Sequence, residues 1–146
     1  MSNSYSSVLA CIALLVFLIG CGGGGGDASS SAPVISSVVI TDWDGNEKKI
    51  FKRGDSVYVE ITVTDSDLDV SYLEATTYYG DTPSDPADGP EVIWLESQSQ
   101  PTMVYSAVRI GFVAADEPSG SQRTDFQVID KENNESNIFT EFVVIE

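Results

Sequence analysis

The sequence contains no histidine, and its 7 lysine and arginine residues stand against 23 aspartate and glutamate residues among 146. Without histidine, the chain cannot assemble a Ser-His-Asp or Cys-His nucleophilic site. The formal net charge of -16 argues against a nucleic-acid partner, because binding to nucleic acids depends on clustered basic side chains. We therefore expect neither a histidine-dependent enzyme nor a nucleic-acid-binding protein.

Cysteines and long apolar segments are also scarce. The 2 cysteines, Cys11 and Cys21, both lie near the N-terminus, so the rest of the chain cannot form an internal disulfide. The uncharged run from Val8 to Ile19 is shorter than the roughly 20 residues that a helix needs to cross a bilayer. Its length is typical of the apolar core of a signal peptide.

The residues that end this run form a motif. Leu18-Ile19-Gly20-Cys21 resembles the lipobox of bacterial lipoproteins. The resemblance implies that residues 1–20 are a signal peptide, that Cys21 carries the lipid anchoring the protein to a membrane, and that residues 21–33 are a flexible Gly/Ser-rich tether. Gly22 follows the cysteine where an aspartate would signal retention, which implies the outer membrane of the cell envelope. The alternative is that Cys21 is an ordinary reactive or paired thiol.

The chain beyond Pro33 has the apolar period of strands and no sustained period of 3.6 residues. In the clearest strand, Val57, Val59, Ile61 and Val63 alternate with Tyr58 and other residues that we expect to face water. Runs rich in β-branched and aromatic residues predict further strands at 34–41, 70–79, 91–96, 103–113, 124–130 and 138–145. About seven short strands separated by turn signals predict one all-β domain over 34–146, an antiparallel β-sandwich.

The segment TDFQVIDKENNESN, residues 124–137, narrows this prediction. Asp130, Asn134 and Ser136 match the closing hairpin, strand then D-x-x-G-N-x-S then strand, of bacterial immunoglobulin-like and fibronectin-III-like surface domains. Asn133 stands where that motif has glycine, and asparagine is the next best residue at positive φ. The chain thus resembles these domains, which implies an immunoglobulin-like sandwich.

Aspartates that follow two of the predicted strands are candidate metal ligands. Asp65, Asp67 and Asp69 alternate in TDSDLD, and Asp130 ends another strand. Carboxylates on a loop are the usual ligands of Ca²⁺. The spacing lacks the glycine and glutamate of an EF-hand, although Asp65-Ser66-Asp67 resembles the D-x-D pair of calcium-binding cadherin-like domains. The alternative is that these acids cap strand ends in Asx turns, with no cofactor bound.

The candidate binding residues lie in turns. Trp43 adjoins the turn at Asp44, and the long loop from Gly80 to Pro90 carries Asp81, Asp85 and Asp88. Rigid aromatic side chains and restrained loops are typical of recognition surfaces. We therefore expect a non-catalytic binding or adhesion module for a protein or glycan. The alternatives are a structural or assembly component of an envelope complex, stabilised by Ca²⁺, and a small hydrolase that uses paired carboxylates.

Overall fold

The computed structural model describes residues 30–80, 88–96 and 99–146. All of the regular secondary structure in these residues is β-strand. No helix in this part of the chain is long and apolar enough to cross a membrane. The strands are β1 (Val34–Thr41), β2 (Ile50–Phe51), β3 (Ser56–Thr64), β4 (Val70–Tyr79), β5 (Asp88–Trp94), β6 (Thr102–Phe112), β7 (Gly120–Asp130) and β8 (Phe139–Ile145).

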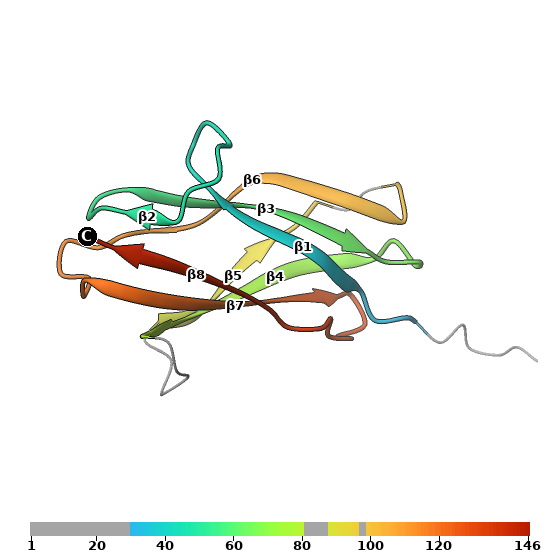
Figure 1. Ribbon diagram of the computed structural model, residues 1–146. Helices are drawn as coiled ribbons and strands as arrows, with labels where there is room; N and C mark the ends of the chain where they lie inside the picture. The colour runs from blue at the N-terminus through green and yellow to red at the C-terminus, as the bar shows by residue number, and fades with distance from the viewer. Residues whose placement is uncertain (1–29, 81–87, 97–98) are drawn as a thin grey trace, which may run out of the picture.

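The strands form two sheets that face each other (Figure 1). One sheet has the order β1-β3-β6 and the other the order β2-β8-β7-β4-β5. Every pairing is antiparallel except that of β2 with β8. The chain changes sheet between β1 and β2, β2 and β3, β3 and β4, β5 and β6, and β6 and β7. Such crossing connections are those of an immunoglobulin-like sandwich, which confirms the predicted fold class.

The predicted strands differ from the observed ones mainly at their ends. The predictions for 34–41 and 70–79 coincide with β1 and β4. No local pattern marks β2, which has only 2 residues. β7 begins at Gly120, a residue typical of turns, and β5 begins at Asp88 and ends at Trp94 instead of spanning 91–96.

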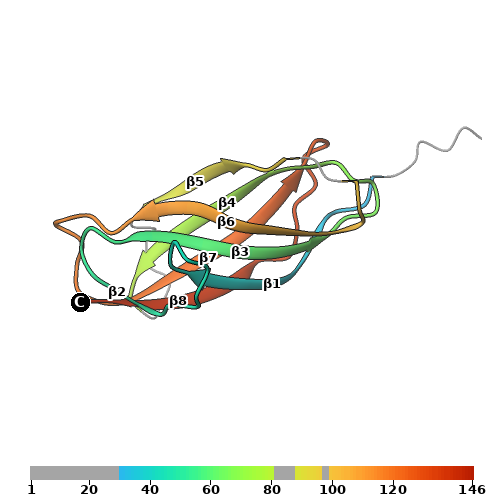
Figure 2. The ribbon, with the colours of Figure 1, turned by 90° about the horizontal axis from the view of Figure 1, so that it is seen from above.

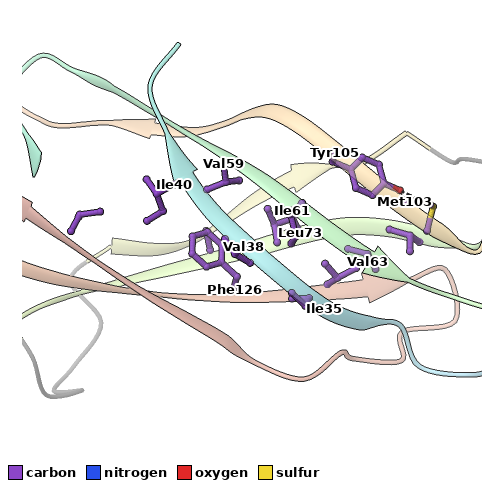
Figure 3. Packing of buried hydrophobic residues seen from close by; sticks show 14 of the residues in the cluster. Ile35, Val38, Ile40, Val59, Ile61, Val63, Leu73, Met103, Tyr105 and Phe126 are labelled. Carbon is purple, nitrogen blue, oxygen red and sulfur yellow. Dashed lines mark hydrogen bonds between the residues drawn. The ribbon is translucent and has the colours of Figure 1, made fainter. Parts of the chain in front are cut away.

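The hydrophobic core lies between the two sheets (Figure 3). Val59, Ile61 and Val63 of β3 are fully buried there, as their alternation predicts, and Val57 is partly buried near the end of the sandwich. Tyr58 lies on the opposite face of β3, which the alternation assigns to water. It is nevertheless buried, and the ring of Trp43 packs against it in a T-shaped arrangement with the ring centroids 5.4 Å apart.

The antiparallel strands give the sandwich two distinct ends. The chain enters at one of them, the entry end, which carries Ser30–Pro33 and the loops 65–69 and 131–138. The opposite end, the far end, carries the loops 42–49, 52–55 and 113–119. The C-terminus also lies at the far end, as both ribbon views show (Figures 1 and 2). The candidate site residues therefore fall into two separate groups.

Candidate functional site

The aspartates at the entry end hold their own loops together. The backbone amides of Asp67 and Asp69 donate to the Asp65 carboxylate at 3.2 and 2.9 Å. In the same way, Asp130 Oδ1 accepts the amides of Glu132 and Asn134, both at 2.8 Å. An aspartate that accepts the amides two and four residues later caps the end of its strand in an Asx-type turn.

Asp42, at the far end, forms the same kind of turn as these two aspartates. Asp42 Oδ1 accepts the amides of Asp44 and Asn46, both at 3.0 Å. These hydrogen bonds lower the pKa of Asp42, that from Asn46 most strongly, because they stabilise the ionised form. The turn at 44–46 is evident in the sequence, whereas the role of Asp42 was missed. The signal that could have found it is an aspartate directly after a strand, with Asp or Asn four residues later.

The four aspartates predicted as calcium ligands lie at the entry end, at the end of β7 and in the loop after β3. Asp67 accepts the backbone amide of Ser31 at 2.6 Å, an interaction that lowers the pKa of Asp67. In the described part of the chain, no group of three or more His, Cys, Asp or Glu side chains is placed to hold a metal ion. Asp65 accepts backbone amides, and Asp130 accepts backbone amides together with the side chains of Ser30 and Asn134. Calcium binding by these residues stays a prediction.

Asp69 differs from its neighbours in this group. Its Oδ1 atom is buried without a hydrogen-bond partner. Burial, the neighbouring Asp65 carboxylate and the negative charge of Asp130 together raise the pKa of Asp69 to about 6. The entry end therefore contains a carboxyl group that takes up a proton at mildly acidic pH.

The predicted binding residues lie at the far end, as far as the structure describes them. Trp43 is 73% exposed although its edge contacts Tyr58. Asp81 and Asp85, like the proposed lipidation site Cys21, lie outside the described residues. The role of all three stays a prediction.

Asp88 requires a correction to the predicted loop. It does not lie in the loop but is the first residue of β5 and is paired with Thr77. The physical reason is Gly89, whose φ of 116° is accessible to glycine. A Cβ atom on Gly89 would lie 2.9 Å from the carbonyl oxygen of Ala75, so this glycine lets β5 approach β4 closely. The loop therefore ends earlier than its prolines and aspartates indicated.

A cavity of about 280 Å³ lies between the two sheets toward the far end. Apolar side chains from both sheets form much of its wall, including Ile40, Val57, Ile110, Val143 and Ile145. Polar residues also line it: Thr77, Glu91, Glu117, Gln122 and Thr124. The sequence does not reveal this site, because its residues come from seven strands and one loop and no local pattern links them.

Hydrogen bonds fix the polar part of this cavity. Gln122 Nε2 donates to Glu117 Oε1 at 2.6 Å, and the hydroxyl groups of Thr77 and Thr124 are 3.2 Å apart. Arg53 holds the loop that carries Glu117, since its guanidinium donates to the Glu117 carbonyl oxygen at 2.7 and 3.1 Å. The position of Glu117 is thus set by two neighbouring segments.

A second hollow, of about 370 Å³, lies where β5 and β6 form the outer strands of the two sheets. Trp94 lines it and is 74% exposed, with its ring edge-on to Tyr72 at 5.3 Å between centroids. The sequence pattern singles out Trp43 as the exposed tryptophan and does not distinguish Trp94, whose strand ends earlier than predicted. Both tryptophans are therefore available for contact.

A comparison with solved structures supports the fold. No protein-family model and no curated protein matched the sequence. Among solved structures, the chain is similar to a Niemann-Pick type C2 protein from the Japanese carpenter ant, with 19% identity and a TM-score of 0.51, covering 82% of this chain and 97% of that one. It is also similar to the PKD domain of an M14-like peptidase from a Thermoplasmatales archaeon, with 15% identity and a TM-score of 0.42, covering 80% of this chain and 98% of that one. At these identities the similarity concerns the fold alone.

Proposed function

We propose that this protein is a non-catalytic binding module of the bacterial cell envelope, anchored by lipid on Cys21 and presenting its far end to a ligand. One observation carries the proposal: the chain enters at one end of the sandwich, and the cavity and exposed Trp43 lie toward the other. A tether at the entry end leaves the far end free to make contacts. Concave sites with apolar walls and a few polar groups are typical binding sites.

The hydrogen bonds of Asp65 and Asp130 support a structural role for these two carboxylates instead of a catalytic one. The Asp65 and Asp130 carboxylates accept backbone amides that hold loops in place. A paired-carboxylate hydrolase instead needs two carboxyl groups facing each other across a substrate. The binding function would be overturned if the purified protein turned over a glycan or a peptide.

The outer strands β5 and β6 of the two sheets are poorly suited to assembly through strand pairing with another chain. Ala107 of β6 has a φ of 55° and lies close to a register shift, so this outer strand is bulged. A second shift interrupts the pairing of β5 near Thr76. Bulges at sheet edges hinder pairing with another chain, so we favour ligand binding over the alternative of a structural component.

The test is capture of partners from solubilised envelope membranes by the tagged full-length protein. We expect Trp43→Ser at the far end to reduce capture at least tenfold. The matched control is Phe142→Ser, which also removes an exposed aromatic ring but lies on β8 in the other sheet. Equal capture by both variants and the parent protein would overturn the proposed role of the far end.

A further inference from the structure

We propose that the far-end cavity binds the alkyl chain of a neutral or cationic amphiphile. The proposal rests on the binding function above and names the ligand class for the same end of the molecule. It follows from the size of the cavity, its apolar wall and the charge of its polar residues. Each of these selects a different part of the ligand.

The apolar wall of the cavity favours the alkyl chain of the ligand. Ile40 of β1 and Val57 of β3 line the cavity from one sheet, and Val143 and Ile145 of β8 line it from the other. An alkyl chain that enters transfers apolar surface out of water, which is favourable by roughly 0.8 kcal/mol per buried methylene. At roughly 30 Å³ per water-sized group, the volume of about 280 Å³ holds a chain of about nine or ten carbons.

The polar residues select the head group. Glu91 and Glu117 both line the cavity, and the chain as a whole carries a formal charge of -16. A carboxylate or phosphate head group would meet the negative charges of Glu91, which is exposed, and Glu117, which is partly buried, and like charges repel. Arg53 does not neutralise Glu117, since its hydrogen bonds go to the Glu117 carbonyl oxygen and to the Ser119 hydroxyl group. A hydroxyl-rich or cationic head group avoids the repulsion.

Binding of the alkyl chain and selection of the head group can be tested separately by substitutions in the cavity. Ala114 lines the cavity from the half-exposed loop after β6, so Ala114→Phe should fill the cavity without disturbing the packed core. Ala114→Leu is a smaller second variant for the case that the first one does not fold. Glu117→Gln removes one negative charge and keeps an oxygen that can accept from Gln122. Glu132→Gln, in a loop at the entry end, removes the same charge far from the cavity.

The experiment uses the full chain with Cys21→Ser, so that no attached lipid competes. The ligands are decyl maltoside, decyltrimethylammonium and decanoate, each at a concentration below that at which micelles form. Calorimetric titration then compares three head groups on the same ten-carbon alkyl chain. We expect decanoate to bind at least tenfold more weakly than the other two. Ala114→Phe or Ala114→Leu should weaken binding of decyl maltoside at least tenfold, and melting curves verify that each variant is folded.

The effect of Glu117→Gln on head-group selection is the more specific test of the inference. We expect Glu117→Gln to tighten decanoate binding about threefold or more, to leave decyl maltoside unchanged, and Glu132→Gln to have neither effect. Equal affinity for all three compounds, no binding, or binding that survives the filled cavity would overturn the inference. If membrane capture still depends on Trp43 in that case, the proposed binding function stands while the ligand class is wrong.

Discussion

Replacing Asp69 by asparagine should stabilise the protein at pH 7. The Asp69 carboxyl has a buried Oδ1 atom without a hydrogen-bond partner, and it lies close to the charges of Asp65 and Asp130. Asparagine has nearly the same shape, carries no charge, and can donate a hydrogen bond toward the Asp65 carboxylate. The substitution therefore removes repulsion and adds a donor, without opening a cavity.

The size and the pH window follow from the raised pKa. Burial and the neighbouring carboxylates raise the pKa of Asp69 from 3.8 to about 6 in the folded protein. Between these values the folded state binds more protons than the unfolded state, so this group makes the free energy of unfolding fall as pH rises from about 4 to about 6. Two pKa units would correspond to roughly 3 kcal/mol, and we expect about 1 kcal/mol after solvent screening of this half-exposed group.

The assay is urea unfolding of the parent protein and the Asp69→Asn variant at pH 4 and pH 7. At pH 7 the variant should gain about 1 kcal/mol, which corresponds to roughly 4 °C in melting temperature. At pH 4, where Asp69 is protonated in the folded protein, the gain should disappear. The matched control is Asp67→Asn, which should not stabilise at pH 7, because the Ser31 amide stabilises the charged form of Asp67. A gain of equal size at both pH values would refute the reasoning.

The anchor, the β4–β5 contact and the aspartate turns can each be tested in the same way. Mass spectrometry of the membrane-extracted protein should find thioether-linked lipid on an N-terminal Cys21, and an intact Met1 in the native host would contradict this. Gly89→Ala should lower the free energy of unfolding by about 2 kcal/mol or more, because the new methyl group meets the Ala75 carbonyl oxygen at 2.9 Å at a φ of 116°; unchanged urea unfolding would contradict it. Millimolar calcium should shift the melting temperature by less than about 1 °C relative to chelator, since the Asp65 and Asp130 carboxylates already accept backbone amides; a shift that Asp69→Asn abolishes would instead show that the entry end takes a cation.

Most strands could be predicted from the sequence because a sandwich imposes its burial pattern along each strand. Every second residue from Val59 to Val63 enters the core, so alternation locates β3 without knowledge of its partners. The closing hairpin was also predictable, since Asn133 adopts a φ of 65° where the related motif has glycine. Local chemistry determines these features, and neighbouring residues in the sequence are enough to recognise them.

Features that depend on contacts between distant segments could not be predicted in this way. Tyr58 packs against Trp43, which the turn after β1 places beside it, and β2 pairs with Val144 and Ile145 of the distant strand β8. The raised pKa of Asp69 requires that the loops after β3 and β7 meet. The aspartates look alike in the sequence, and the fold distinguishes their roles.

The hydrogen bonds of Ser30 and Ser31 determine from which side a ligand would reach the cavity. Ser30 donates to Asp130 at 3.3 Å and accepts from Asn134 at 2.9 Å, while the Ser31 amide donates to Asp67. The chain is thus fixed to the sandwich from Ser30 onward. A strand as long as β6, with 11 residues, spans about 36 Å at roughly 3.3 Å per residue. The far end therefore lies about that far from the point where the chain enters the sandwich, and with the anchor proposed at Cys21 the amphiphile would reach the cavity from the side away from the tether.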